Sequence, residues 1–506
     1  MAGVQQQHHG WQAGDLLADL DLPDGGWRRL PVSGLTLDSR SVDKDYLFLA
    51  VAGTRSHGLV HLQQALDNGA SLILAEASPD WPQDRIRRLK CSVPILVLDG
   101  LQRMDSKIAA RFHGNPAQDM RMVGVTGTNG KTSVSLFLAQ ALPEEWCCAV
   151  TGTTGNGFPG RLQPASHTTP DAVQAQRILA DLKLAGAKTV AMEVSSHALD
   201  QYRVAAVPFH TAVFTNLSRD HLDYHGSMQA YAAAKRRLFG MQGLQLAVVN
   251  ADDAAGEELL SSLKGKVTTI ACYRGDSSVD AEKFIRIERM EQRSQGLYLR
   301  CSSSWGSAEI NSRLLGDFNA DNLMLVLGVM LGWGVPISQA VARLQCLETV
   351  PGRMQKLGGG NHPLVVVDFA HTPDALSKVL TSLRGHTSGD LYCVFGCGGD
   401  RDRGKRAHMG RLAEALADRV ILTDDNPRAE ASAAILEDIL EGMQAPRNTL
   451  VIPDRAKAIA TAIGQAQAGD TILVAGKGHE TWQQIGQQRL PFSDVEQVRH
   501  CLGGLA

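Results

Sequence analysis

The chain has 506 residues, too many for one hydrophobic core, and its length suggests about three domains of roughly 150 residues each. Its 50 basic and 53 acidic residues give a formal net charge of −3, which excludes a chain-wide basic field for sequence-independent nucleic-acid binding. No apolar run approaches the roughly 20 residues of a membrane span, no secretion signal opens the chain, and its 9 cysteines form no C-x-x-C pair, so we expect a cytoplasmic protein.

Residues 1–99 predict a small α/β domain. Strand-like runs lie at residues 45–51, 71–76 and 94–98. A helical pattern lies between the first two runs, at residues 61–68. An amphipathic helix over residues 101–112 then leads into a central domain, which we place at residues 100–350.

A phosphate-binding loop is predicted at residues 123–132, V-G-V-T-G-T-N-G-K-T, where a β-branched run ends, and a helix-like stretch follows at residues 133–142. Its backbone N–H groups would cradle phosphates, and Gly127 and Gly130 permit sharp turns. Lys131 would reach the outer phosphates, and Thr132 would ligate magnesium. The strict pattern G-x-x-x-x-G-K-[ST] fails by one place, which indicates a compressed loop and disfavours signalling GTPases.

Further apolar runs in the central domain predict a mostly parallel sheet, because strands and helices alternate along the chain. These runs lie at residues 189–194, 211–215 and 246–250. A polar stretch at residues 274–312 alternates in character and suits a peripheral antiparallel insertion.

Two polar segments of the central domain contain candidate metal ligands. Glu193 follows an apolar run in A-M-E-V-S-S-H, where an acidic residue can hold a metal that bridges nucleotide phosphates. The alternative is a buried structural glutamate. His221, in T-N-L-S-R-D-H-L-D-Y-H-G, is a candidate second ligand, and the alternative is an ordinary loop histidine.

Residues 351–506 predict a doubly wound, Rossmann-like domain. It begins with a candidate hinge at Pro351-Gly352. Five apolar runs each end in a polar loop, at residues 364–368, 391–395, 420–423, 449–452 and 471–474. In such a sheet, ligands gather at the carboxyl ends of the strands, so these loops should share one rim. Cys393 and Cys397 lack further metal ligands and are interpreted as packing residues.

Many spaced motifs together resemble one known family. G-T-N-G-K-T, E-V-S-S-H, N-L-S-R-D-H-L-D-Y-H, Y-A-A-A-K, P-G-R-M, D-F-A-H-T-P, D-D-N-P-R and A-G-K-G-H-E occur in the order seen in the Mur ligases of peptidoglycan synthesis. The similarity runs from about Leu35 to Asp494. It implies a UDP-substrate domain, a P-loop-type ATP domain and an amino-acid-binding domain, at residues 1–99, 100–350 and 351–506.

The resemblance implies an ATP-dependent amide ligase of the diaminopimelate-adding type, working through an acyl phosphate with Mg²⁺. Its partners would be ATP, UDP-MurNAc-L-Ala-D-Glu and meso-diaminopimelate, with no nucleic acid, and the protein would be a monomer. Lys235, in Y-A-A-A-K, matches a lysine that this family carbamylates, whereas the sequence alone favours a plain surface lysine. The implied catalytic residues are Lys131, His221, Lys235 and Arg353, and the implied metal ligands are Thr132, Glu193, His221 and carbamylated Lys235.

The family correspondence also gives the substrate sites, residue by residue. For ATP, it gives Gly127, Thr128, Asn129, Gly130, Lys131, Thr132, Ser133, Asn319, Asn322, Asp368 and His371. For the UDP-substrate, it gives Leu37, Ser39, Thr54, Arg55, Ser56, His167, Thr168, Thr169, Ser195, Gln201 and Arg203. For the N-terminal part of this set, the alternative is turn and cap chemistry.

The motif D-N-P-R indicates which amino acid is added. The resemblance implies a diaminopimelate site formed by Arg401, Asp425, Asn426, Pro427, Arg428, Gly476 and Glu480. Meso-diaminopimelate differs from lysine by a second carboxylate, which the guanidinium of Arg428 can bind in a bidentate fork. A lysine substrate would leave that arginine unpaired, at a cost of about 2–5 kcal/mol.

Four positions depart from the family pattern: Ser133 replaces a threonine, His167 an asparagine, Gln355 an acidic residue and Phe369 a tyrosine. The first rival interpretation is a lysine-adding or folylpolyglutamate-type ligase with the same ATP machinery. The second is a nucleotide-switched binding protein without synthetase activity.

Overall fold

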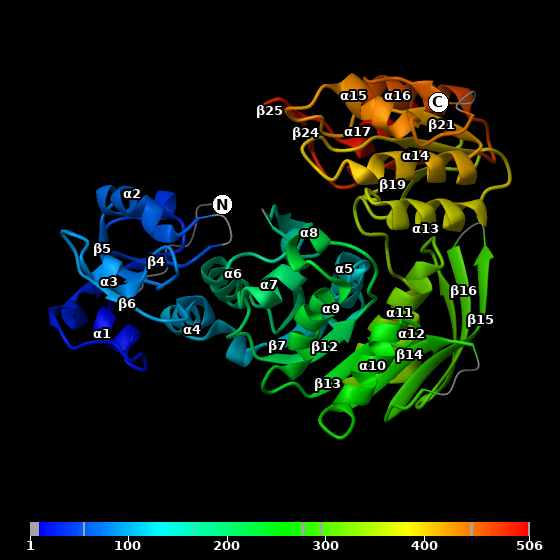
Figure 1. The fold of residues 1–506 in the computed structure, drawn as a ribbon. Coiled ribbons are helices and arrows are strands. Elements are labelled where there is room, and N and C mark those ends of the chain that lie inside the picture. Colours follow the sequence, from blue (N-terminus) through cyan, green and yellow to red (C-terminus); the bar gives the residue numbers. More distant parts are fainter. Residues whose placement is uncertain are drawn as a thin grey trace. The chain divides into compact units, whose positions relative to one another are not determined.

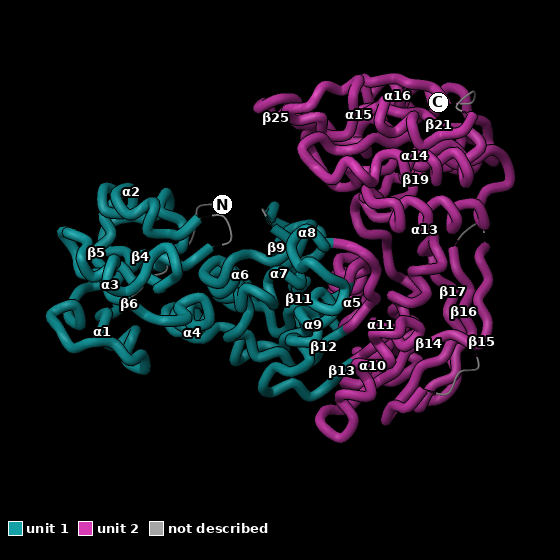
Figure 2. Tube along the Cα trace, viewed as in Figure 1, with its two compact units in different colours: residues 1–127, 143–213, 221–247 teal, residues 128–142, 214–220, 248–506 magenta. Residues whose placement is uncertain are grey.

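The computed structural model describes residues 10–53, 56–165, 167–275, 279–293, 296–445 and 449–503. The chain divides into two compact units, coloured in Figure 2: residues 1–127, 143–213 and 221–247 form unit 1, and residues 128–142, 214–220 and 248–506 form unit 2. The predicted α/β class is confirmed, since helices and strands alternate along the chain (Figure 1). The predicted domain boundaries after residues 99 and 350 stay a prediction.

The first sheet of unit 1 confirms the small α/β region predicted near the N-terminus. Its strands are all parallel, in the order β3-β4-β5-β6. Leu47 and Leu49 pack with α1 and α4, whereas Phe48 and Ala50 pack with α2 and α3, because alternate residues of a strand face opposite sides. The elements are β1 (Trp11–Gln12), α1 (Ala13–Leu16), β2 (Pro31–Val32), β3 (Gly34–Thr36), β4 (Tyr46–Ala50), α2 (Leu62–Asp67), β5 (Ala70–Ala75), α3 (Gln83–Arg87), β6 (Ile95–Val97) and α4 (Leu101–Phe112).

The strands of the 11-stranded sheet that fall in unit 1 follow the order β10-β9-β8-β11-β7-β12. Strands β8, β11 and β7 are parallel, with Ala191 opposite both Val150 and Val123. This confirms the parallel arrangement predicted from the strand, helix, strand order. The elements are β7 (Arg121–Thr126), β8 (Cys148–Gly152), β9 (Gly155–Phe158), β10 (Arg161–Gln163), α6 (Ala172–Leu184), β11 (Thr189–Glu193), α7 (Ser196–Asp200), β12 (Phe209–Phe214), α8 (Leu222–His225) and α9 (Met228–Arg236).

Further strands of that sheet fall in unit 2, in the order β14-β15-β16-β17. The pairs β15–β16 and β16–β17 are antiparallel, which confirms the antiparallel insertion predicted at residues 274–312. Helix α11 is buried along most of its length. The elements are α5 (Lys131–Ala141), β13 (Leu246–Asn250), α10 (Ala254–Leu263), β14 (Thr268–Arg274), β15 (Lys283–Arg293), β16 (Gly296–Ser303), β17 (Gly306–Ser312), α11 (Phe318–Gly332) and α12 (Ile337–Gln345).

The C-terminal sheet of unit 2 has the order β18-β19-β23-β20-β21-β22, in which only β18 is antiparallel. Helices α13, α14 and α15 cover one face and α16 and α17 cover the other, which confirms the doubly wound prediction (Figure 1). Cys393 and Cys397 lie in the first of these cores. The elements are β18 (Gln355–Gly358), β19 (Leu364–Asp368), α13 (Pro373–Arg384), β20 (Leu391–Phe395), α14 (Gly404–Leu416), β21 (Arg419–Leu422), α15 (Ser432–Leu440), β22 (Thr449–Val451), α16 (Arg455–Gln465), β23 (Thr471–Ala475), β24 (Trp482–Ile485), β25 (Gln488–Pro491) and α17 (Asp494–Gly503).

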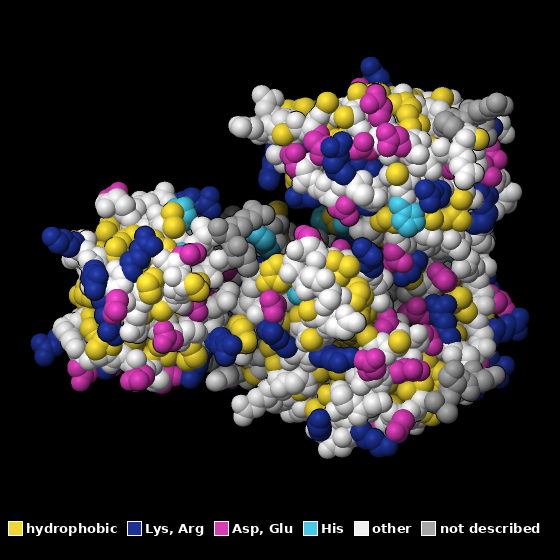
Figure 3. All heavy atoms as spheres, viewed as in Figure 1, with side chains coloured by type: hydrophobic (Ala, Val, Ile, Leu, Met, Phe, Trp, Pro, Cys, Tyr) yellow, Lys and Arg dark blue, Asp and Glu magenta, His cyan; other side chains and the backbone are white. Residues whose placement is uncertain are grey.

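The surface charges are mixed. On the face shown in Figure 3, Lys and Arg side chains are interspersed with Asp and Glu side chains over both units, in keeping with a net charge of −3. Within the described residues, every helix is too short or too polar to span a bilayer.

One buried carboxyl group of unit 1 predicts a pH-dependent stability. Asp105 on α4 is 3% exposed, and burial, followed by the charges of Asp171 and Glu76, raises its pKa to about 8, against the lowering effects of the Ser106 N–H and Arg203. Between about pH 4 and pH 8 the folded chain therefore keeps a proton that the unfolded chain releases, so stability should fall as pH rises, by up to about 1.4 kcal/mol per pH unit.

The measurement compares melting temperatures of the wild type and Asp105→Asn at pH 5.5, 7 and 8.5. Asparagine keeps an oxygen for the Ser106 N–H, which lies 2.6 Å from Asp105 Oδ1, but it has no proton to lose. The variant should lose less stability than the wild type over this range. Identical pH profiles would refute the assignment.

Candidate active site

The predicted phosphate loop lies between β7 and α5. Gly127 and Gly130 have φ angles of +149° and +86°, in the region that favours glycine, so their predicted turning role is confirmed. Helix α5 begins at Lys131, two residues before the expected start at Ser133, so the N–H groups of its first turn follow the loop directly. Lys131 Nζ donates to Thr128 O at 2.9 Å, which places its positive charge at the loop.

Residues 215–218 hold the conformation of the loop. The N–H groups of Thr128 and Asn129 donate to Asn216 O and Oδ1, at 2.9 and 3.0 Å. Thr215 Oγ1 donates to Asn129 O at 2.6 Å, and Ser218 N donates to Thr128 Oγ1 at 3.0 Å. Sequence reasoning missed Asn216, although it follows an apolar run and belongs to the same motif as His221, T-N-L-S-R-D-H.

Asn319 and Asn322, predicted near the nucleotide, are buried on α11. Asn322 Nδ2 donates to Asn319 Oδ1 at 2.9 Å, which orients its amide. A Cβ added to Gly130 would lie 2.7 Å from Asn322 Oδ1. Asn322 therefore abuts the turn of the phosphate loop.

Because the family resemblance implies that this loop binds ATP, replacing Gly130 with alanine should raise the KM for ATP at least tenfold. The Cβ would strain a left-handed backbone by about 1–2 kcal/mol and press on Asn322, so the loop would shift. Phosphate release at varied ATP concentration measures this effect. Gly114→Ala is the matched control, because Gly114 also has a positive φ of +71° but its added Cβ would meet nothing within 4 Å. A KM for ATP within twofold of the wild type would contradict the prediction.

Asp368 and Arg353 approach each other around the loop after β19. The Asp368 carboxylate accepts from Met354 N at 2.7 Å and Ala370 N at 2.8 Å. Burial raises the pKa of Asp368, and the charge of Arg353 opposes this rise. The Arg353 guanidinium also lies over the Phe369 ring, with Cζ 4.6 Å from the ring centroid. The predicted ATP and catalytic residues of this region are thus brought together.

Phe369 stands where a tyrosine was expected, and it keeps the aromatic contacts. The rings of His371 and His479 lie 4.8 and 5.2 Å from its centroid. His371 Nδ1 is 2.8 Å from Phe369 O. The predicted residue His371 thus belongs to the same cluster as Arg353 and Asp368.

Lys235 on α9 is buried, at 2% exposure, so the alternative of a plain surface lysine is wrong. Its Nζ donates to the carbonyl oxygen of Gly127, one of the two turn glycines of the phosphate loop, at 2.7 Å and lies 4.4 Å from the Tyr231 ring centroid. A buried lysine beside a phosphate loop is unusual, because burial of an ammonium group is costly. This position suits a residue with a chemical role.

Glu193, at the end of β11, is also buried. Its carboxylate accepts from Thr153 N at 2.8 Å and from Thr153 Oγ1 at 3.1 Å. A Cβ on Gly152 would collide with the same carboxylate, so a glycine is required beside it. These contacts fix the carboxylate and are compatible with both a ligand role and a structural role.

His221 belongs to an aromatic cluster of unit 1. The His197 ring lies 4.9 Å from His221 and 5.4 Å from His225, centroid to centroid. Burial, followed by the charges of His221 and His225, lowers the pKa of His197 to about 4, so this ring is neutral at neutral pH. Sequence reasoning gave no role to His197, although it closes the E-V-S-S-H motif. Within the described residues, no group of three or more His, Cys, Asp or Glu side chains forms a metal site.

Several residues predicted for the UDP-substrate form one hydrogen-bond network in unit 1. Arg203 donates through Nη1 to Thr169 O at 3.0 Å and through Nη2 to Gln201 Oε1 at 2.6 Å. Thr168 Oγ1 lies within hydrogen-bond distance of Thr153 Oγ1, at 3.1 Å, and Ser195 N donates to Thr169 Oγ1 at 3.0 Å. The network brings a cation and hydroxyl groups together, as a diphosphate or sugar site needs.

The N-terminal part of that set is more dispersed. Ser39 is buried, and its hydroxyl donates to Gln64 Oε1 at 2.7 Å. Cap chemistry is instead seen at Ser195, in the network around Arg203: its hydroxyl oxygen accepts from Ala198 N at 3.2 Å and caps the start of α7. Leu37 is partly buried against the N-terminal core, and Ser56 and His167 are exposed. Thr54 and Arg55 lie outside the described residues.

Polar residues after β21 and β23 meet at one rim, as predicted for a doubly wound sheet. Asn426 Nδ2 donates to Glu480 Oε2 at 3.0 Å. Lys477 is completely buried, and its Nζ donates to Asn426 Oδ1 at 3.1 Å and Glu480 Oε2 at 2.9 Å. A Cβ on Gly476 would lie 2.5 Å from Asp425 Oδ2. Sequence reasoning missed Lys477, whose only signal was its place in A-G-K-G-H-E.

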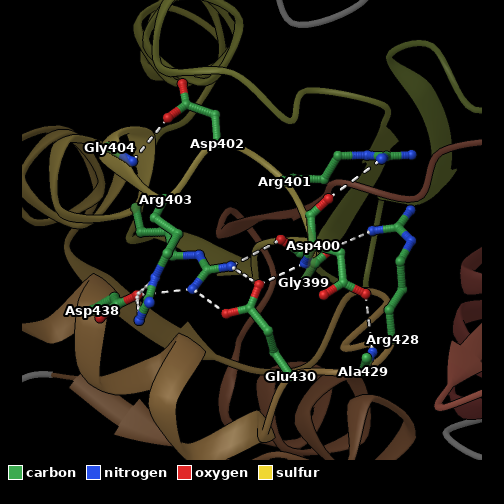
Figure 4. A network of polar contacts seen from close by, with 12 residues as sticks. Gly399, Asp400, Arg401, Asp402, Arg403, Gly404, Arg428, Ala429, Glu430 and Asp438 are labelled. Carbon is green, nitrogen blue, oxygen red and sulfur yellow. Dashed lines mark hydrogen bonds and ion pairs between the residues drawn. The ribbon is translucent and has the colours of Figure 1, made fainter. Parts of the chain in front are cut away.

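Two arginines complete this rim from the loops after β20 and β21. Arg428 Nη1 donates to Gly399 O at 2.7 Å (Figure 4). A Cβ on Gly398 would lie 2.8 Å from Arg428 Nη1 and 3.6 Å from Arg401 Cγ, so both side chains flank the same glycine. Burial, followed by the charge of Arg401, lowers the pKa of Arg428. Two neighbouring guanidinium groups form a favourable place for a carboxylate.

Comparisons with known proteins agree with this geometry. Residues 125–330 match the model of the Mur ligase middle domain, and residues 352–478 match the model of the Mur ligase, glutamate ligase domain. These ranges contain the Gly127–Thr132 part of the phosphate loop, Glu193, Lys235 and the rim residues as far as Lys477.

Relatives resemble the chain over nearly its full length. UDP-N-acetylmuramoyl-L-alanyl-D-glutamate–2,6-diaminopimelate ligase of Alkalilimnicola ehrlichii is 50% identical over 488 residues, 96% of this chain and 97% of that protein. The ligase of the same name from Pseudomonas aeruginosa is 48% identical, over 94% of this chain and 96% of its own. A solved structure with this name has a TM-score of 0.68 and 37% identity, and the match covers 96% of this chain and 97% of the solved one.

Proposed function

The chain belongs to the Mur ligase family, and we propose that it is the ATP-dependent ligase that adds meso-2,6-diaminopimelate in peptidoglycan precursor synthesis. The acceptor is the D-glutamate side-chain carboxylate of UDP-N-acetylmuramoyl-L-alanyl-D-glutamate. The observation that carries the substrate assignment is the rim where Arg401 and Arg428 flank Gly398. A distal carboxylate could accept hydrogen bonds from both guanidinium groups, and lysine has no such group.

The reaction proceeds in two steps. The D-glutamate carboxylate oxygen attacks the γ-phosphorus of ATP, so the bond to ADP breaks and an acyl phosphate forms. The amine of diaminopimelate then attacks the acyl carbon, phosphate leaves, an amide forms and the amine loses a proton. A free carboxylate is a poor acyl donor, which is why activation precedes bond formation. Lys131 and Arg353 are proposed to stabilise the charge of the migrating phosphoryl group.

Mg²⁺ is the proposed cofactor, with Thr132, Glu193, His221 and carbamylated Lys235 as ligands. The fixed, buried carboxylate of Glu193 suits a hard cation, and Lys235 Nζ already lies at the loop, 2.7 Å from Gly127 O. When bound, Mg²⁺ would neutralise charge on the phosphate oxygens.

The remaining assignments follow the family correspondence and are proposals. Asn319, Asn322, Asp368 and His371 would serve the nucleotide together with the phosphate loop, Gly127–Ser133. The network around Arg203 would bind the UDP-substrate. Asp425, Asn426, Gly476 and Glu480 would hold the ammonium and polar ends of the amino acid. We also propose a monomer that works in the cytoplasm on small-molecule substrates.

The deciding experiment measures phosphate release with ATP, Mg²⁺ and the UDP-dipeptide, in the presence of meso-diaminopimelate or L-lysine. Release should depend on the amino acid and favour meso-diaminopimelate strongly. Equal use of both amino acids would refute the specificity, and a preference for lysine would identify the lysine-adding rival. Activity with a folate substrate would favour the folylpolyglutamate-type rival, and ADP without an amide product would refute the ligase itself.

A further inference from the structure

Arg406, on α14, contacts both loops that carry the two arginines of the proposed diaminopimelate site, Arg401 and Arg428. Resting on the proposed function, we propose that Arg406 is a positioning residue: through Glu430 it holds the loops that carry Arg401 and Arg428 at the spacing needed to bind the distal carboxylate of the added amino acid. It does not touch the substrate itself. Its effect would be on selectivity for a dicarboxylic amino acid.

The Arg406 guanidinium is completely buried and joins three elements. Nη1 and Nη2 donate to the two carboxylate oxygens of Glu430, at 2.9 and 2.8 Å. Nη1 also donates to Asp438 Oδ2 on α15 at 2.8 Å, and Nη2 donates to Gly398 O at 3.3 Å. Gly398 is the residue that both rim arginines flank, so Arg406 binds the backbone at the centre of the site.

Glu430 extends the link to the second loop. Its Oε1 accepts from Asp400 N at 2.5 Å, and Asp400 Oδ2 accepts from Ala429 N at 3.1 Å (Figure 4). Gly399 N donates to Asn426 O at 2.9 Å. The loop after β20 and the loop after β21 thus each donate hydrogen bonds to the other. Glu430, in the second loop, is the residue whose carboxylate accepts from Arg406.

These contacts surround two residues whose backbone lies in the left-handed region. Asp400 and Arg428 both have φ of +54°, in a region that is costly for residues with a Cβ. A Cβ on Gly399 would collide with Pro427 O, so the two loops also interlock sterically. If the cross-link is lost, both residues are free to relax, and Arg428 would leave its place beside Arg401.

The planar fork of the guanidinium, rather than its charge alone, explains why an arginine is needed at position 406. Hydrogen bonds from Arg406 and from Asp400 N lower the pKa of Glu430 to about 2, so Glu430 is ionised throughout the working range. Lysine at position 406 would keep the charge but could not reach Glu430, Asp438 and Gly398 with one planar fork. Arg406→Lys therefore removes the geometry and leaves the charge.

The test uses the full chain and compares Arg406→Lys, Glu430→Gln and the wild type in phosphate release with meso-diaminopimelate and L-lysine. Both variants should raise the KM for meso-diaminopimelate at least tenfold, with the KM for ATP within twofold of wild type. The ratio of kcat/KM for the two amino acids should fall at least tenfold. Arg384→Met is the matched control, because it deletes an exposed ion pair with Asp418 (2.7 Å) in the same sheet region.

Melting temperatures separate a positioning role from a purely structural one. A variant that melts earlier but keeps its KM for meso-diaminopimelate and its selectivity would overturn the inference, as would equal rises in the KM values for all substrates. If Arg406→Lys fails to fold, Glu430→Gln, which changes one oxygen to nitrogen, decides the question. A wild type that releases no phosphate with meso-diaminopimelate would overturn the proposed function and this inference together. Unchanged selectivity of the variants beside an active wild type would overturn the inference alone.

Discussion

Replacing Arg428 with methionine is expected to lower kcat/KM for meso-diaminopimelate by about 30-fold or more. Loss of one partner of a desolvated, charge-assisted pair costs about 2–5 kcal/mol, and each 1.4 kcal/mol is a factor of ten. Arg428 is half-buried, and burial and the charge of Arg401 both disfavour its charged form, because they lower its pKa. A carboxylate bound beside it would therefore be attracted by both guanidinium groups. Methionine keeps much of the side-chain stem but has no charge.

The change should be selective for the dicarboxylic substrate. Use of L-lysine should change by less than threefold, because lysine has no distal carboxylate for Arg428 to bind. Arg419→Met is the control, since Arg419 begins β21, which leads into the same loop, but forms an exposed ion pair with Asp390 (3.3 Å). Phosphate release at varied amino-acid concentration gives both values. Parallel losses with both amino acids would show that Arg428 supports the loop rather than the selectivity.

The sheet beneath this rim could be predicted because its strands are covered on both faces. Residues buried on both sides are apolar without interruption, and the polar loop that follows marks the end of the strand. The runs predicted at residues 364–368 and 391–395 match β19 and β20 at both ends. The rule that ligands gather at the carboxyl ends then placed Asp425 and Glu480 in one region.

The contacts that organise the rim could not be predicted. Arg406 reaches Glu430 across 24 residues, and Lys477 reaches Asn426 across 51 residues. No local periodicity encodes such pairs, because they depend on how neighbouring strands are ordered in the sheet. The positive φ angle of Arg428 also could not be predicted, because sequence rules expect such angles mainly for glycine, asparagine and aspartate.

Lys235, which has a proposed chemical role, is another residue whose contacts could not be predicted from the local sequence. Its surroundings on α9, Y-A-A-A-K, give a weak amphipathic signal, and the sequence alone favoured exposure. Burial arises because the helix lays Lys235 against Gly127 O, a contact across 108 residues. The family resemblance singled out Lys235, and the structure shows that the residue is buried at the phosphate loop.

Replacing Lys235 with either methionine or arginine is expected to lower phosphate release at least 100-fold. If the neutral amine takes up CO₂, it forms a carbamate and releases a proton, so a buried cation becomes an anionic oxygen ligand. Methionine and arginine both lack an amine that reacts in this way, but arginine keeps the positive charge. Loss in both variants would therefore separate a carbamate role from a simple ammonium role.

CO₂ supplies an independent readout. The wild type should lose activity in CO₂-free buffer and recover it when bicarbonate is added, whereas neither Lys235 variant should recover. Lys183→Met is the matched control, because Lys183 also lies near the end of a helix but forms an exposed ion pair with Asp119 (2.6 Å). Melting temperatures check that the buried substitution leaves the fold intact. Activity of Lys235→Arg near the wild-type level would mean that the charge suffices, because a guanidinium beside Gly127 O supplies a cation and no metal ligand.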